Sequence, residues 1–233
     1  MIEALAWGSF AAASLVLGAL VAFARDWDDR QVGLVLAFGA GALISAVSFE
    51  LAEEGVAIGG SAAVGIGLAA GALTYFTLDS LLDRAAGSAD AGVGLALGAF
   101  LDGIPEQLVL GIGLAAGGSI GVGLLVAIFV SNLPEAIGSA RAMEAAGRSR
   151  RAVLSLWVAI AALCAVASVA GYGLASVASK ELQGAIDGFA AGALLVMLID
   201  SMIPEAARKG GRVAGLVTTL GFAVATGLST LAA

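Results

Sequence analysis

Length, composition and charge define the class of this chain before any motif does. Of its 233 residues, 60% are hydrophobic and only 12% are charged, and the mean hydropathy is +1.03, so a soluble domain of this length could not bury its apolar surface. The net charge is −7, and with one cysteine (Cys164) and no histidine the chain cannot hold an intrachain disulfide, a Cys- or His-based metal site, or a Ser-His-Asp triad.

Apolar runs recur along the whole chain, and each is long enough to be a transmembrane helix. A span needs about 20 mostly apolar residues to cross a hydrocarbon layer of roughly 30 Å. No segment between the runs is long enough for a separate soluble domain, so we expect one all-α integral membrane domain over residues 1–233. Its eight transmembrane helices are expected at about 4–24, 32–52, 57–79, 92–115, 119–140, 152–175, 184–204 and 212–231.

The basic residues predict the orientation of these helices. Ten of the eleven Lys and Arg follow or close the first, third, fifth and seventh runs, and only Lys180 falls on the other side. By the positive-inside rule the ten face the cytoplasm, so we expect a multi-pass protein of the plasma or inner membrane with both termini outside. The ten are Arg25, Arg30, Arg84, Arg141, Arg148, Arg150, Arg151, Arg208, Lys209 and Arg212.

An inverted repeat is expected from two similar segments. Residues 38–43 read Phe-Gly-Ala-Gly-Ala-Leu and residues 189–194 read Phe-Ala-Ala-Gly-Ala-Leu, and the same offset of 151 positions carries Glu54 onto Glu205. The helices that carry them run in opposite directions, so the first three and last three helices would form inverted halves around the fourth and fifth, a 3+2+3 arrangement common in transporters. The alternative is that Gly/Ala-rich helices resemble one another by composition alone.

Glutamates gather at the predicted outer end of the second helix, at Glu50, Glu53 and Glu54. Negative side chains that line a cleft concentrate cations there. We interpret these three as a cation-attracting vestibule, and the alternative interpretation is a solvated helix end.

Each of the three prolines is followed by glutamate, in the pairs Pro105-Glu106, Pro134-Glu135 and Pro204-Glu205. A proline inside a helix kinks it and frees the carbonyl four residues back. At membrane depth a freed carbonyl is tolerated only where another group satisfies it. We therefore expect three kinks, each in polar surroundings.

Oxygen-bearing side chains are expected to converge between the fourth and fifth helices. Asp102 and Glu106 are four residues apart and share a helix face, as do Ser131 and Glu135, with Asn132 beside them. A charge at this depth costs about 2.5–3.5 kcal/mol on insertion scales. These ligand types suit a divalent cation. The alternative is that the acids are protonated and only hydrogen-bond the helices together.

These motifs, in this order, resemble those of the ZIP family of divalent metal transporters over essentially the whole chain. The family carries His-Asn-x-Pro-Glu-Gly on its fourth helix, a His- or Gln-led x-x-x-Pro-Glu-Gly on its fifth, and acid-x-x-Ile-Pro-Glu on its seventh. Here the counterparts are Asp-Gly-Ile-Pro-Glu-Gln at 102–107, Ser-Asn-Leu-Pro-Glu-Ala at 131–136 and Asp-Ser-Met-Ile-Pro-Glu at 200–205. The second helix of the family shows Phe-Leu-His-Leu-Leu-Pro-Glu, and residues 48–54 here read Ser-Phe-Glu-Leu-Ala-Glu-Glu.

The resemblance implies a transporter rather than an enzyme. It would move Zn²⁺, or Mn²⁺ or Fe²⁺, from outside into the cytoplasm by alternating access, with the metal as substrate and no prosthetic group. Every histidine of the family motifs is replaced, which should favour harder ions over Zn²⁺. The expected partners are the metal and the lipid bilayer, with no nucleic acid, and Gly and Ala on helix faces would permit a homodimer.

The resemblance also assigns residues by position. Asp102 stands at a metal-binding His and Glu106 at a motif glutamate. The implied metal ligands are Asp102, Glu106, Ser131, Asn132 and Glu135, the implied pathway residues are Glu50, Glu53, Glu54, Asp200 and Glu205, and the implied kinks are Pro105, Pro134 and Pro204.

Two other functions fit parts of the pattern. A degenerate ZIP-like protein that serves as a sensor or structural partner would explain the missing histidines. An intramembrane aspartyl protease could use Asp102 and Asp200 as acids that share a proton. Neither Asp lies in the Gly-x-Gly-Asp setting of such proteases, and the three Pro-Glu pairs would have no role.

The change Asp102→Asn separates the protease from the transporter. Proteolysis should vanish, because an aspartyl dyad needs both acids. Metal uptake should only weaken, because an amide oxygen can still ligate a cation. Cleavage of a membrane peptide and metal uptake, both measured on the one purified variant, check this, and proteolysis that survives the change would rule out the dyad.

Overall fold

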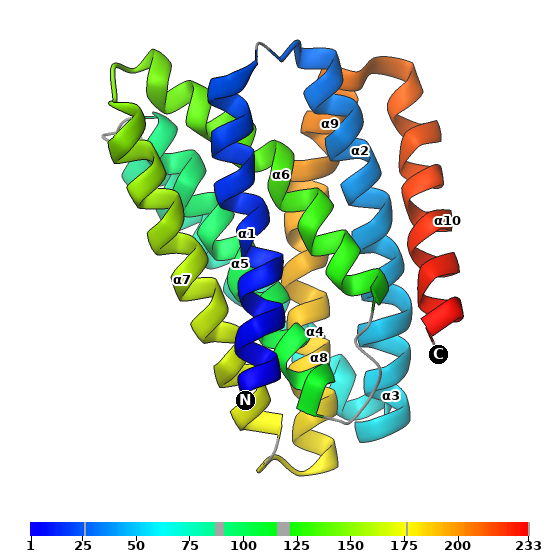
Figure 1. Cartoon of the computed structure of the whole chain (residues 1–233). Coiled ribbons are helices and arrows are strands. Elements are labelled where there is room, and N and C mark those ends of the chain that lie inside the picture. Colours follow the sequence, from blue (N-terminus) through cyan, green and yellow to red (C-terminus); the bar gives the residue numbers. More distant parts are fainter. Residues whose placement is uncertain (26, 87–90, 116–121, 176, 233) are drawn as a thin grey trace.

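Every secondary-structure element in the described part of the chain is helical, which confirms the expected all-α class (Figure 1). The computed structural model describes the chain apart from residues 26, 87–90, 116–121, 176 and 233, and apart from the side chains of residues 82–86, 91–102, 122, 123, 127, 131, 134, 135, 142, 231 and 232.

The elements follow one another with short connections. In chain order they are α1 (Ile2–Ala24), α2 (Asp29–Ser45), the π-helical segment η1 (Ala46–Glu53), α3 (Glu54–Gly59), α4 (Ser61–Ala86), α5 (Ala91–Ala115), α6 (Val122–Ala145), α7 (Arg150–Ala175), α8 (Lys180–Met197), the π-helical segment η2 (Leu198–Met202), α9 (Ile203–Gly210), the 3₁₀ turn η3 (Gly211–Val213) and α10 (Ala214–Ala232).

Four helices continue further than the apolar runs predicted: α4 starts at Ser61 instead of residue 57 and reaches Ala86 instead of residue 79, α6 reaches Ala145 instead of residue 140, and the second and seventh spans are also longer. The second span was expected to end at residue 52, but α2, η1 and α3 form one continuous helix to Gly59. Charges did not end it because Leu51 and Gly55 are buried on one side while Glu53 and Glu54 are exposed on the other. The helix ends where Gly60 adopts a φ of 82°, a conformation that costs glycine little.

The seventh span behaves in the same way. It was expected to end at residue 204, but α8, η2 and α9 continue to Gly210, and Gly211 then turns the chain with a φ of 65°. Gly60 and Gly211 are 151 positions apart, the offset that also relates Glu54 to Glu205.

Helices that are distant in sequence pack as close pairs. The most extensive contacts join α4 to α8, α5 to α7, α2 to α10, and α1 to both α6 and α7. In Figure 1, α10 lies at one edge of the bundle beside α2, and α7 lies at the other edge. Both termini lie in the lower half of that view.

Glycines bring the backbones of α2 and α10 into direct contact. A Cβ atom built on Gly41 would collide with the carbonyl oxygen of Thr218, and one on Gly221 would collide with the carbonyl oxygen of Phe38. Small residues of this kind let helices approach closely in a membrane, where dispersion contacts rather than the hydrophobic effect hold them together.

The α4–α8 pair repeats this arrangement. A Cβ on Gly192 would collide with the carbonyl oxygen of Leu68, and one on Gly71 with that of Phe189. Gly192 and Phe189 each lie 151 positions after a residue that makes the equivalent contact in the α2–α10 pair.

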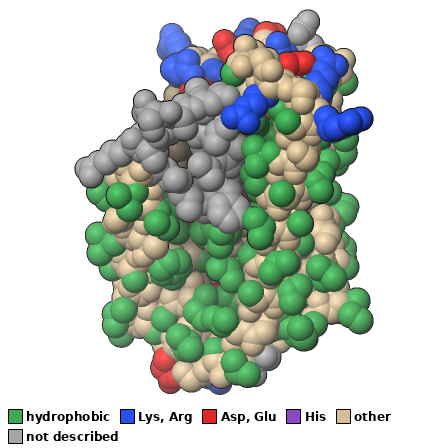
Figure 2. Space-filling model, turned by 90° about the vertical axis from the view of Figure 1, so that its left-hand side faces the viewer, with side chains coloured by type: hydrophobic (Ala, Val, Ile, Leu, Met, Phe, Trp, Pro, Cys, Tyr) green, Lys and Arg blue, Asp and Glu red, His purple; other side chains and the backbone are tan. Residues whose placement is uncertain are grey.

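Large apolar side chains cover the outside of the bundle. Among the described residues, five helical stretches are long and apolar enough to cross a membrane. Exposed side chains such as Ile66 and Phe76 on α4 and Leu216 and Leu220 on α10 face outward. Figure 2 shows hydrophobic side chains over the middle and lower parts of one face, and most of its charged side chains at the upper end. The chain is therefore a membrane-embedded protein, whereas the side that its termini face stays a prediction.

The helix contact predicts opposite effects for two substitutions on α4. Gly71→Ala should destabilise the protein by about 1–3 kcal/mol, because the new methyl group would push α4 away from α8. Gly65→Ala is the matched control: no described atom lies within 4 Å of its Cβ position. It should be neutral or stabilising, because alanine favours a helix by roughly 0.5–1 kcal/mol over glycine. Thermal unfolding in detergent measures both, and equal shifts in Tm would contradict the packing.

Candidate functional site

A carboxylate and two amides are buried inside the apolar bundle. Glu106 and Gln107 on α5 are 1% and 0% exposed, and Asn132 on α6 is 1% exposed. The two helices contact each other, and Pro105 directly precedes Glu106 inside α5. This burial agrees with the expectation that Glu106 and Asn132 face the interior rather than lipid.

Part of the expected ligand set lies outside the described side chains. The backbones of Asp102, Ser131, Pro134 and Glu135 belong to α5 and α6, but their side chains are not described. Helical spacing places Asp102 one turn before Glu106, and Ser131 one turn before Glu135. Among the described side chains no group of three or more Cys, Asp or Glu could hold a metal ion.

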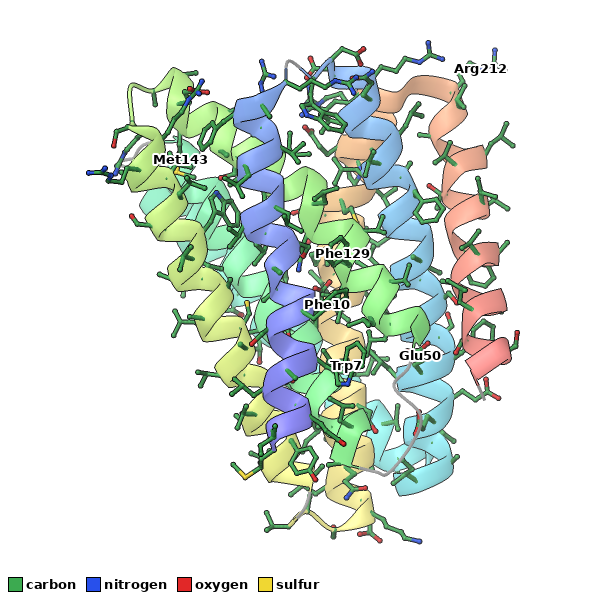
Figure 3. All side chains as sticks on the ribbon, viewed as in Figure 1. Trp7, Phe10, Glu50, Phe129, Met143 and Arg212 are labelled. Carbon is green, nitrogen blue, oxygen red and sulfur yellow. The ribbon has the colours of Figure 1, made fainter. Side chains whose placement is uncertain are left out.

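Aromatic rings line the seam between α1 and α6 beside this site. Phe129 on α6, three residues before Asn132, stacks on Phe10 of α1 with 5.7 Å between ring centroids. Trp7 meets Phe10 edge to face at 6.0 Å. Figure 3 shows the three rings following one another along α1. Phe10 is 53% exposed, so these rings cover the outer side of the α1–α6 contact with apolar surface.

Gln107 is a buried polar residue that the motif analysis did not assign. Neither atom of its side-chain amide has a hydrogen-bond partner among the described residues. Its Oε1 lies beside α1 and α7: a Cβ on Gly8 would be 3.2 Å from this atom and 2.9 Å from Ser168 Oγ. Ser168 itself donates to the carbonyl of Ala4 at 3.1 Å. A polar amide directly after a Pro-Glu pair in an apolar run was the signal for it.

Glu50 connects three helices in the half of the bundle away from Arg212 (Figure 3). Its carboxylate accepts a hydrogen bond from the Ser229 hydroxyl on α10 at 3.0 Å and another from the backbone N–H of Leu124. Leu124 lies in the first turn of α6, where backbone N–H groups have no partner inside the helix and the helix dipole favours an anion. Glu50 therefore anchors the start of the helix that carries Asn132.

The other predicted pathway acids lie in two different environments. Glu53 and Glu54, at the junction of η1 and α3, are exposed, and so is Asp200 on η2. Glu205 on α9 is half-buried and accepts hydrogen bonds from Arg208 at 3.0 Å and Lys209 at 2.8 Å. Glu205 is thus neutralised by neighbouring cations, which its i+3 and i+4 spacing to them allows.

A π-helical segment lies shortly before each of the two acids that the offset of 151 relates, Glu54 and Glu205. η1 ends at Glu53, immediately before Glu54, and η2 ends two residues before Pro204, which occupies the first turn of α9. A π-helix widens the turn and often marks a functional position in a helix. Pro204 therefore follows the widened turn inside a continuous helix, where a local change of hydrogen-bond pattern can accommodate its missing N–H.

The comparisons with known proteins assign no family. No protein-family model matches the chain, and no curated protein matches it with significant similarity. The functional assignment therefore depends on the ordered motifs and on the burial described above.

The hydrogen bonds of Glu50 predict a contribution to stability. Glu50→Ala should lower the free energy of unfolding by about 1 kcal/mol, the usual cost of removing a helix cap. Glu53→Ala, an exposed neighbour of equal size and charge, should change it little. Thermal unfolding in detergent compares them, and a Glu50→Ala variant as stable as Glu53→Ala would contradict the anchoring role.

Proposed function

We propose that this chain is a divalent-cation transporter of the ZIP type, which moves Zn²⁺, Mn²⁺ or Fe²⁺ from outside into the cytoplasm by alternating access. The observation that carries the proposal is the complete burial of Glu106 and Asn132 on two contacting helices inside an apolar bundle. Ionisable residues within membrane helices are expensive and mark ion pathways by default.

The chemistry of these groups supports a cation as substrate. Carboxylate and amide oxygens are hard ligands, and an ion between α5 and α6 would balance the charge of Glu106 in a medium where water cannot. Asp102, Ser131 and Glu135, one helical turn from Glu106 or beside Asn132, would complete the set. With no histidine nitrogen, such a site should bind Mn²⁺ or Fe²⁺ relatively better than a His-based site does.

Matching packing in the two halves of the chain supports the inverted 3+2+3 repeat. Contacts of α2 with α10 correspond to those of α8 with α4, and contacts of α1 with α6 correspond to those of α7 with α5. The offset of 151 residues relates Gly41 to Gly192, Glu54 to Glu205 and Gly60 to Gly211. Composition alone would not place contact glycines, acids and turns at one common offset.

Alternating access would then move the central helices against two outer pairs. The α2–α10 and α4–α8 pairs touch backbone to backbone, so each pair would move as a unit. At the basic end, Lys209 lies 2.8 Å from Glu205 and 3.9 Å from Asp29, which ties α9 to the start of α2. Release of an ion on this side would require these ion pairs to separate.

Uptake into proteoliposomes tests the function directly. Purified protein would be offered Zn²⁺, Mn²⁺, Fe²⁺, Co²⁺ and Cd²⁺ separately, beside the double variant Glu106→Ala/Glu135→Ala. We expect uptake to fall in the double variant to the level of protein-free liposomes, because the carboxylates of both motif glutamates are gone.

The matched control is Glu144→Gln, which removes a charge from the inner end of α6, where Glu144 pairs with Arg150 at 2.7 Å. It should transport like the unchanged protein, since exposed ion pairs contribute little. Full uptake by the double variant would overturn the central site. No uptake of any ion by folded, unchanged protein would favour the non-transporting sensor.

A further inference from the structure

A buried acid on α8 points at the acidic end of η1 and α3. Asp187 is 5% exposed, and it lies seven residues into α8, about 10 Å from the start of that helix. A Cβ atom on Gly55 would lie 3.0 Å from Asp187 Cβ and 3.5 Å from its Oδ2. The carboxylate is therefore directed at the turn of α3 that carries Glu54.

The position of Asp187 is fixed by the backbone. A Cβ on Gly59 would lie 2.8 Å from Gly184 Cα, and one on Gly184 would lie 2.8 Å from the carbonyl oxygen of Gly55. The helices α3 and α8 therefore touch about one turn before Asp187. The backbone of Asp187 stays beside α3 as long as these two helices remain in contact.

Asp187 has no compensating partner in the part of the chain that the structure describes. The structure gives it no hydrogen bond or ion pair with any described residue. The charge of Glu54 acts on both Asp187 and Glu50, so three carboxylates from two continuous helices share one region. One oxygen of Glu50, Oε2, is also buried without a hydrogen-bond partner. Acids placed so closely repel each other unless a cation or a proton neutralises them.

We propose that Glu54 and Asp187 form a divalent-cation subsite between α3 and α8, which the substrate ion occupies before it reaches the central site. The second half of this statement rests on the proposed transport function, whereas binding itself does not. The subsite would take an ion with oxygen ligands, and water would fill its remaining positions. Two carboxylates and water hold a cation weakly and release it fast, as the first site on a conduction pathway requires.

The other half of the chain has no counterpart of this subsite. The offset of 151 residues places the apolar, buried Leu36 opposite Asp187. It places Glu205 opposite Glu54, and Glu205 is already paired with Arg208 and Lys209. Among the described residues Glu54 and Asp187 therefore have no ion pair, whereas Glu205 has two. A cation would be collected at the end of Glu54 and Asp187 and not held at the opposite end.

Binding measured without the central site tests the subsite. The parent would be Glu106→Ala/Glu135→Ala in detergent, with bound Mn²⁺ counted by electron paramagnetic resonance. We expect this parent to bind one weakly held Mn²⁺, and Asp187→Asn or Glu54→Gln to lose it. Combining the two changes should not lower the amount of bound Mn²⁺ further, because the two acids share a single ion.

The matched control is Glu181→Gln, which removes an exposed acid from the first turn of the same helix. It should keep the bound Mn²⁺, so that a loss in the other variants is not an effect of overall charge. Unchanged binding in both Asp187→Asn and Glu54→Gln would overturn the subsite. Should Asp187→Asn fail to fold, Glu54→Gln decides alone, because Glu54 is exposed and its replacement leaves the packing intact.

Uptake kinetics separate this proposal from the transport function. With an intact central site, Asp187→Asn should raise the KM for uptake and leave the maximal rate unchanged, because only capture is weakened. Uptake with an unchanged KM would overturn the proposed subsite but would still support the proposed transport function. Loss of Mn²⁺ binding in a protein that transports nothing would keep the subsite and overturn the transporter.

Discussion

Direct contact between the backbones of α2 and α10, and of α4 and α8, is the constraint on which the other features depend. Side chains would separate these helices by several ångströms, whereas Gly41, Gly71, Gly192 and Gly221 let carbonyl oxygens sit where a Cβ would otherwise be. The π-helical segments and the acids that follow them are attached to these pairs. Their positions are therefore set by main-chain geometry, which leaves little freedom for Glu54, Asp187 and Glu205 to rearrange independently.

The helical class and the membrane character followed from composition and run length, because a bilayer accepts only a backbone that satisfies its own hydrogen bonds. The ends of the second and seventh helices did not follow. A cluster of charges in a sequence resembles a helix end, but on this turn Glu53 and Glu54 are exposed while Leu51 and Gly55 are buried. Gly60, through its φ of 82°, decides where the helix ends.

At the candidate site, helical spacing and intramembrane cost were enough to anticipate the burial of Glu106 and Asn132. Spacing within one helix says nothing about which other helix faces a residue. Asp187 was overlooked because its partner turn lies more than a hundred residues away. Glu205 matched a pathway acid by motif, but its ion pairs with Arg208 and Lys209 depend on rotamers that a sequence does not contain.

The pairing of α2 with α10 has a consequence for biosynthesis. Gly41 is translated 180 residues before Gly221, which belongs to the same α2–α10 contact. At the usual elongation rate the first helix of this pair waits on the order of ten seconds for the second. During that time its glycine surface is open to the other helices of the nascent chain, so the correct pairing has to compete with contacts that form earlier.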